Sequence, residues 1–133
     1  MSRILIIEDE PHIVMSLEFL MTQAGHEVQV VTDGSGAGKA IASFAPDLIL
    51  LDIMLPGVSG FDICRTVRAE ADSACTKVVM LSARGRQTEI DRGLASGADA
   101  YVTKPFDTKE LMLLTARLLA GEDVGRLPAQ LDT

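Results

Sequence analysis

The chain has 133 residues, which is the size of one compact domain and leaves no room for two ordinary ones. Apolar residues make up 47% of the sequence and aromatic residues 4%, so we expect an aliphatic core and exclude extensive disorder. The formal net charge of -7 argues against direct binding to nucleic acid or to an anionic membrane, because both need clustered Lys and Arg.

The first apolar run spans residues 4–7 and is followed directly by acidic residues. It is too short for a signal peptide or a membrane span, so we expect a cytoplasmic protein. Two further runs, at residues 48–51 and 78–81, are equally short, unbroken and closed by a polar residue. Such runs are typical of strands that are covered on both faces, as in a parallel sheet.

Stretches with the helical period of 3.6 residues lie between these runs. Their apolar faces consist of Ile13, Leu17, Leu20 and Met21 in the first stretch, Ala37, Ala40, Ile41 and Phe44 in the second, and Ile63 and Val67 in the third. Pro11 stands near the start of the first stretch and Gly25 follows it, while Pro46 ends the second. The spacing of the apolar residues and the positions of Pro and Gly therefore both predict helices in these stretches.

The remaining elements are indicated by alternation and capping. Residues 27–32 predict a second strand and residues 100–103 a short fifth one. Asp107 can cap a last helix, and Glu110 stands three residues later, as in a capping box. The chain thus alternates strand and helix five times, which predicts an α/β fold with a five-stranded parallel sheet, helices on both faces and right-handed crossovers. This pattern alone does not determine the strand order.

We predict one domain at residues 1–120 and a flexible tail or the start of a linker at residues 121–133. The final segment contains two more helix breakers and has no apolar stripe. Cys64 and Cys75 show no metal-ligand spacing, so we interpret both as reduced thiols in or beside a helix.

Chemically active side chains directly follow four of the five predicted strands. They are Glu8, Asp9 and Glu10 after the first strand, Asp52 after the third, Ser82 after the fourth, and Lys104 with Pro105 after the fifth. Because ligands of open α/β sheets bind outside the carboxyl ends of the strands, we expect these groups to meet at one edge. Glu8, Asp9 and Asp52 would then repel one another, and a hard divalent cation would relieve that repulsion; Mg²⁺ fits best.

Each of these residues also has a purely structural interpretation. Acids at residues 8–10 are favoured at a helix N-terminus, and Asp52 could cap the turn into Pro56-Gly57. Ser82 could cap a helix, and a lysine such as Lys104 at a strand end is usually just solvated. None of these interpretations explains why all the groups lie on the same edge.

The ordered set resembles the receiver domains of two-component response regulators. The resemblance runs from residue 3 to about residue 120, and it is carried by Glu8-Asp9-Glu10-Pro11, the segment from Asp52 to Gly60, Leu81-Ser82-Ala83 and Lys104-Pro105-Phe106. It implies a flavodoxin-like, doubly wound fold with the strand order 2-1-3-4-5.

By this resemblance, Asp52 is the phosphoacceptor, and its carboxylate takes a phosphoryl group from the phosphohistidine of a sensor histidine kinase or phosphotransfer protein. Mg²⁺, or Mn²⁺ in its place, is bound by Asp9, Asp52 and the backbone carbonyl of Met54, and Glu8 acts through a metal-bound water. The chain is then not an enzyme in the ordinary sense. It assists only its own phosphorylation and the hydrolysis of its aspartyl phosphate.

The resemblance also implies a switch. Lys104 and Ser82 bind the phosphoryl oxygens, and Tyr101 turns inward as Ser82 moves toward the phosphate. The bond from Lys104 to Pro105 is usually cis in this family. The face of the fourth helix, fifth strand and fifth helix is expected to bind a downstream protein target or a second copy of the chain. Ala100 stands where an acid often precedes the aromatic residue, which weakens the inference of a charge-paired dimer.

Three other functions share parts of this pattern. A flavodoxin-like FMN binder would need a phosphate-binding loop after the first strand, where the acids at residues 8–10 would repel the phosphate, and it would be yellow. An aspartyl-phosphate phosphatase would need a second Asp where Met54 stands. A pseudo-receiver, which only binds partners, would normally have lost one of the acids, Asp52 or Lys104, and all are present.

Overall fold

A computed structural model describes residues 2–83 and 85–122. Its elements are β1 (Arg3–Ile7), α1 (Pro11–Gln23), β2 (Glu27–Val31), the 3-10 helix η1 (Gly34–Gly36), α2 (Ala37–Phe44), β3 (Leu48–Asp52), α3 (Gly60–Ala69), β4 (Lys77–Ser82), α4 (Gln87–Ala95), β5 (Ala100–Thr103) and α5 (Thr108–Leu119). The tail predicted at residues 121–133 lies outside the described residues from residue 123 onward.

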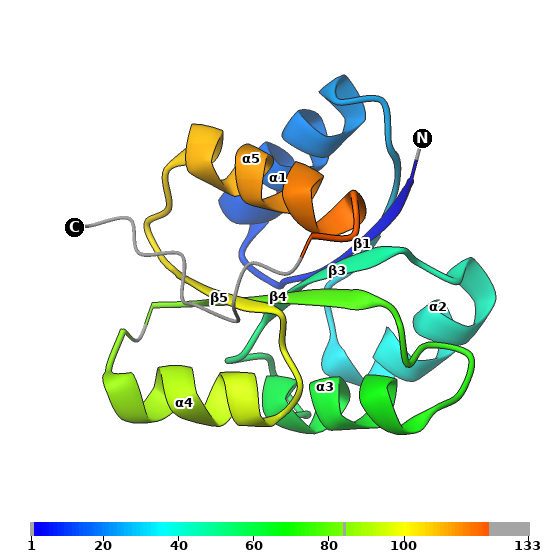
Figure 1. The fold of residues 1–133 in the computed structure, drawn as a ribbon, viewed down its shortest axis with the longest axis vertical. Coiled ribbons are helices and arrows are strands. Elements are labelled where there is room, and N and C mark those ends of the chain that lie inside the picture. Colours follow the sequence, from blue (N-terminus) through cyan, green and yellow to red (C-terminus); the bar gives the residue numbers. More distant parts are fainter. Residues whose placement is uncertain (1, 84, 123–133) are drawn as a thin grey trace.

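Five parallel strands form one sheet in the order β2-β1-β3-β4-β5, which confirms the flavodoxin-like α/β fold. Helices α1 and α5 cover one face of the sheet, and α2, α3 and α4 cover the other (Figure 1). The alternation of side chains along the strands divides the core accordingly. Leu5, Ile49 and Met80 pack in one buried cluster, and Ile6, Leu50 and Leu81 pack in a separate one.

The strands differ from their predicted bounds at points that concern the site. β3 includes Asp52 and β4 includes Ser82, so both are the last residues of their strands instead of following them. In the sheet register Asp52 lies beside Leu81, and Ser82 lies beside Thr103. The hydrogen-bonded ladder therefore holds the backbones of both residues.

The helices follow the predicted alternation, and Pro46 stands two residues after the last residue of the second one. α2 ends at Phe44, before Pro46, because Ala45 takes a left-handed conformation with φ 51 and closes the helix. The alternation predicted the fourth helix, α4, without an apolar face being identified for it; α4 buries Ile90 and Gly93, and Leu94 packs against the same core. Among the helices of the described residues, none combines the length and the apolar character needed to cross a bilayer.

The predicted cap of α5 is confirmed. One side-chain oxygen of Asp107 accepts hydrogen bonds from the backbone N–H groups of Lys109 at 2.9 Å and Glu110 at 3.1 Å. These bonds satisfy donors that the first turn of a helix otherwise leaves unpaired. The cap directs the chain from β5 back over the sheet.

Candidate functional site

Three carboxylates meet at the carboxyl ends of β1 and β3. Glu8 and Asp9 follow β1, and Asp52 ends β3. These strands are hydrogen-bonded neighbours, and one carboxylate oxygen of each acid lies within 4.8 Å of the other two. The sheet therefore brings together acids that are far apart in the chain, as the strand-end pattern led us to expect.

Lys104 reaches this cluster from the end of β5, which is two strands away from β3. Its Nζ donates to Glu8 Oε1 at 2.9 Å and lies 3.4 Å from Asp52 Oδ1. Its backbone N–H donates to the carbonyl oxygen of Ser82 at 2.7 Å, and the peptide bond to Pro105 is cis. The Lys104 side chain is only 16% exposed, so the interpretation as a merely solvated lysine is wrong.

Burial dominates the electrostatics of Glu8, whose side chain has no exposed surface. Desolvation raises the pKa of Glu8, while hydrogen bonds from Lys104 Nζ and from the backbone N–H of Glu10 lower it. The nearby carboxylate of Asp52 raises the pKa of Glu8 further. Three carboxylates beside one ammonium group leave an excess of negative charge at this edge.

The donor set suits a hard divalent cation. The available ligand atoms are carboxylate oxygens, which Mg²⁺ and Mn²⁺ prefer, and Asp9 is exposed, so that it connects the cluster to solvent. Met54 lies beside them, because its backbone N–H donates to Asp52 Oδ1 at 3.2 Å. The residues present therefore fit the metal that the acid cluster predicted.

Of the residues for which helix capping was considered, Glu10 is a cap and Ser82 is not. Glu10 caps α1, since its side chain accepts from the N–H groups of His12 at 2.8 Å and Ile13 at 3.1 Å. Ser82 does not cap α4, whose N-cap residue is Arg86. Ser82 is the last residue of β4 and is 1% exposed.

Tyr101 is only 1% exposed, so its side chain is buried although β5 is the edge strand of the sheet. Its ring packs against the face of the sheet that α4 covers, in the same core cluster as Met80 and Ile90. Tyr101 and Ser82 both line a cavity of about 330 Å³ that extends to Phe61. The two residues that the resemblance links in a switch thus share one space.

Gly60 contributes to the site in a way that the sequence did not indicate. A Cβ atom on Gly60 would lie 2.7 Å from the Cα of Ile53 and 3.0 Å from the carbonyl oxygen of Asp52. The N–H of Gly60 also donates to the carbonyl oxygen of Ile53 at 3.2 Å. Glycine therefore lets the start of α3 pack directly against the backbone that carries Asp52. Its only sequence signal was its place after Ser59, which caps α3.

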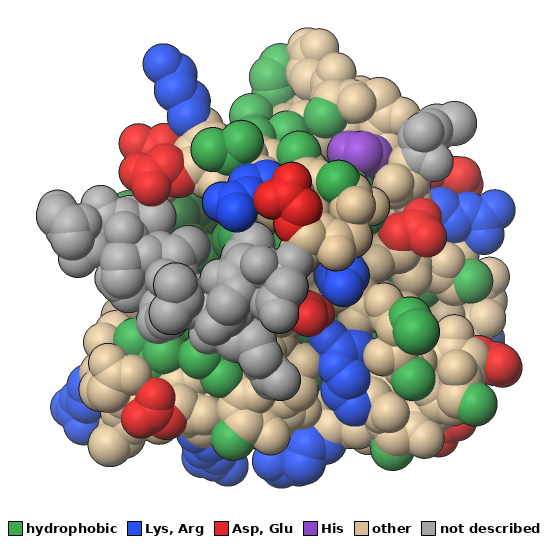
Figure 2. Space-filling view, viewed as in Figure 1, with side chains coloured by type: hydrophobic (Ala, Val, Ile, Leu, Met, Phe, Trp, Pro, Cys, Tyr) green, Lys and Arg blue, Asp and Glu red, His purple; other side chains and the backbone are tan. Residues whose placement is uncertain are grey.

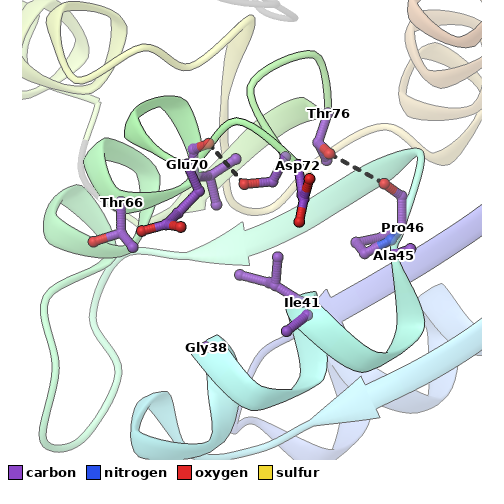
Figure 3. Close-up of a pocket in the computed structure, with 11 residues that line it drawn as sticks. Gly38, Ile41, Ala45, Pro46, Thr66, Glu70, Asp72 and Thr76 are labelled. Carbon is purple, nitrogen blue, oxygen red and sulfur yellow. Dashed lines mark hydrogen bonds between the residues drawn. The ribbon is translucent and has the colours of Figure 1, made fainter.

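A second hollow lies between α2 and α3, on the side of the sheet where β3 and β4 begin (Figure 3). Ile41 points into it from α2, and Glu70 and Asp72 lie across from it. The hydroxyl of Thr76 donates to the carbonyl oxygen of Pro46 at 3.2 Å and links the loops that precede the two strands. This hollow contains none of the predicted site residues.

The fold and the site together define a class: a doubly wound α/β domain with a cluster of acids that could hold a cation, and a lysine, at the carboxyl edge of its sheet. The sequence model of the response regulator receiver domain matches residues 4–116. The chain therefore belongs to the receiver-domain family of two-component response regulators.

Relatives and solved structures agree with this assignment. The DNA-binding response regulator MtrA of Mycolicibacterium smegmatis is 43% identical over 122 residues, which are 91% of this chain and 52% of that protein. The phosphate regulon transcriptional regulatory protein PhoB of Rhizobium meliloti is 41% identical over 117 residues, which are 88% of this chain and 52% of that protein. The chain thus spans about half the length of the curated relatives it matches.

Two solved structures illustrate the fold. The chemotaxis response regulator CheY4 of Vibrio cholerae has a TM-score of 0.83 and 26% identity, and the match covers 89% of this chain and 98% of that one. The receiver domain of the sensor histidine kinase PA1611 from Pseudomonas aeruginosa has a TM-score of 0.82 and 28% identity, with 90% and 98% covered. That structure has a magnesium ion coordinated in its active-site cleft.

Proposed function

We propose that the domain, at residues 1–120, accepts a phosphoryl group on the carboxylate of Asp52. The donor is the phosphohistidine of a sensor histidine kinase or phosphotransfer protein. The observation that carries this proposal is the convergence of Glu8, Asp9 and Lys104 around a nearly buried Asp52. The domain is not an enzyme that turns over a separate substrate, since it assists only its own phosphorylation and dephosphorylation.

In the transfer step, an Asp52 oxygen forms a bond to phosphorus while the phosphorus–nitrogen bond of the phosphohistidine breaks. The electron pair of that bond stays on the imidazole nitrogen, and the product is a mixed anhydride of carboxylate and phosphate. Lys104, held 2.9 Å from Glu8 Oε1, neutralises charge on the transferred oxygens. Ser82 donates its hydroxyl to one of them. Catalysis by these residues consists mainly of positioning and charge neutralisation.

Asp9, Asp52 and the backbone carbonyl of Met54 would hold Mg²⁺ or Mn²⁺, with Glu8 acting through water. The bound cation would supply charge neutralisation at the phosphoryl group and orient it toward Asp52. The support for this assignment is the cluster of carboxylate oxygens within 4.8 Å of one another, together with the Met54 N–H that donates to Asp52.

We propose that Ser82 and Tyr101 convert phosphorylation into a change at the α4-β5-α5 face. A downstream protein or a second copy of the chain would bind there. Leu113 on α5 is 61% exposed, which supports a protein partner at that helix. Hydrophobic side chains also gather over the layer of α1 and α5 (Figure 2), where Met15 and Phe19 of α1 are exposed, but α1 is not part of this face. With a net charge of -7, this domain is not expected to contact nucleic acid itself.

We also propose that the protein is located in the cytoplasm. Cys64 is buried and Cys75 is exposed, and both are free thiols. Free thiols suit a reducing compartment, which is where reduced cysteines persist. The proposed phosphodonor would have to reach the domain in that compartment.

The proposal is tested by intact-mass measurement after incubation with acetyl phosphate, a small phosphodonor. We expect a gain of one phosphoryl group, about 80 Da, in the presence of Mg²⁺. We expect no gain when EDTA removes the metal. A gain that is equal with and without divalent metal would contradict the proposed role of the acid cluster.

We also expect Mg²⁺ to stabilise the folded domain. A ligand that binds only the folded state raises the free energy of unfolding by about 1.4 kcal/mol at ten times its Kd. The melting temperature should therefore rise with MgCl₂ at constant ionic strength. Asp9→Asn should shrink this rise, and Asp72→Asn, which changes an exposed acid in the α2–α3 hollow, should retain it. An equal rise in Asp9→Asn would place the stabilising ion elsewhere.

A further inference from the structure

We propose that Gly93 is a positioning residue of the switch, because its missing side chain makes room for the buried ring of Tyr101. Gly93 is buried in the last turn of α4. A Cβ atom built there would lie 2.8 Å from Cδ2 and 3.2 Å from Cε2 of Tyr101. Real Cβ atoms do not approach other atoms as closely as the first of these distances, so the ring in its present position requires a glycine at residue 93.

A glycine inside a helix needs a reason, since alanine stabilises the same position. The chain offers a direct comparison in Gly38, which lies inside α2. A Cβ atom on Gly38 would meet nothing within 4 Å. The demand for glycine at residue 93 therefore comes from what α4 packs on and not from the helical conformation.

Two neighbours would meet the added methyl group, and they differ in their ability to move. The Sδ atom of Met80 would lie 2.9 Å from it, but a methionine side chain is unbranched and can adopt other rotamers. The ring of Tyr101 is rigid and moves only as a unit, by rotation about χ1 and χ2. The ring is consequently the group that a side chain at residue 93 would displace.

The topology provides a place for the displaced ring. β5 is the edge strand of the sheet, so a rotated Tyr101 side chain would pass the edge into solvent instead of entering another strand. A ring displaced from under α4 would therefore lie outside this edge. Gly93 favours the buried position by leaving it unobstructed.

The position of the ring also concerns the phosphoryl site. Tyr101 and Ser82 line the same cavity, so the room available to the Ser82 hydroxyl depends on where the ring lies. This consequence rests on the proposed function, whereas the contact between Gly93 and Tyr101 does not. The contact can be tested on the unphosphorylated protein, so a failure of phosphorylation would not affect the result.

Tyr101 is the single tyrosine of the chain, which has no tryptophan, so intrinsic tyrosine emission reports on this residue alone. We would measure acrylamide quenching of that emission in the full chain for the wild type, Gly93→Ala and Gly38→Ala. The expected result is weak quenching in the wild type and in Gly38→Ala. In Gly93→Ala, quenching should rise toward the value of urea-unfolded protein while far-UV circular dichroism remains native. Unchanged quenching in a folded Gly93→Ala would overturn the proposal.

A second measurement covers the case in which Gly93→Ala does not fold. The substitution would be repeated in a Tyr101→Ala background, where the ring is absent, and urea midpoints would be compared. We expect Gly93→Ala to raise the midpoint in that background, as an alanine inside a helix should. A loss of the same size with and without the Tyr101 ring would show that the methyl group is excluded by something else, and the proposal would be wrong.

Discussion

Asp52→Asn is expected to abolish the Mg²⁺-dependent gain of phosphoryl mass from acetyl phosphate. The amide of asparagine has nearly the shape of the carboxylate but lacks its charge and its nucleophilic oxygen, so it cannot form the mixed anhydride. Removing the nucleophile of a covalent mechanism typically costs several orders of magnitude in rate. We therefore expect no modified protein in the time that fully modifies the wild type, as followed by intact mass.

The fold should tolerate this substitution. Lys104 Nζ lies 3.4 Å from Asp52 Oδ1 but donates to Glu8 Oε1 at 2.9 Å, so the lysine keeps a partner. The matched control is Asp72→Asn, which removes an exposed carboxylate from the opposite edge of the sheet and should accept phosphate normally. If Asp52→Asn still gained the mass, peptide mapping would identify another acceptor, and the assignment of Asp52 would fail.

Arg68→Ala is expected to lower the free energy of unfolding by about 3 kcal/mol, the low end of the cost of breaking a buried ion pair, because this pair is partly buried. Arg68 lies at the end of α3 and is 24% exposed in its side chain. Its Nε donates to the carbonyl oxygen of Gly97 at 2.8 Å, and one Nη atom lies 2.5 Å from Asp99 Oδ2. The other Nη atom donates to the backbone carbonyl of Thr76.

The loss of stability in Arg68→Ala should be large because several groups that bind the guanidinium lose their partner at the same time. Asp99 is 25% exposed and also accepts from the N–H of Val78 at 2.9 Å, so its carboxylate cannot turn freely to solvent. The carbonyl oxygens of Gly97 and Thr76 would be left without the guanidinium. Arg68 thus joins the end of α3 to the loops that precede β4 and β5. Arg68→Lys should lose much of the same stability, because an ammonium cannot reproduce the fork of donors.

Urea denaturation followed by circular dichroism measures this prediction. A loss of about 3 kcal/mol should lower the urea midpoint by roughly 1–3 M. Arg65→Ala is the control, since Arg65 lies one turn earlier on α3 and pairs with exposed Asp62. Pairs of this kind contribute at most about 1 kcal/mol. Equal midpoints for the two variants would contradict the proposed importance of the Arg68 network.

Much of the fold could be predicted from the sequence, because its signals are local. The runs at residues 4–7, 48–51 and 78–81 are apolar throughout, since a strand with helices on both faces must bury all of its side chains. The cap at Asp107 depends on backbone groups only two and three residues away. α4 was predicted only from the alternation of strands and helices, because a nine-residue helix that buries only Ile90 and Gly93 carries few apolar residues.

The site residues, too, were predicted in part from local sequence, and the rest depended on tertiary structure. The sequence alone placed Glu8, Asp9, Asp52, Ser82 and Lys104 at strand ends, and only a resemblance to known receivers suggested the strand order. The contact between Lys104 Nζ and Glu8 Oε1 joins residues 96 positions apart, so it depends on the order of the strands. The same holds for the burial of Tyr101, the close approach of α4 at Gly93 and the bonds of Arg68. Periodicity and capping act over a few residues of one chain segment, whereas these distances result from how separate segments pack against one another.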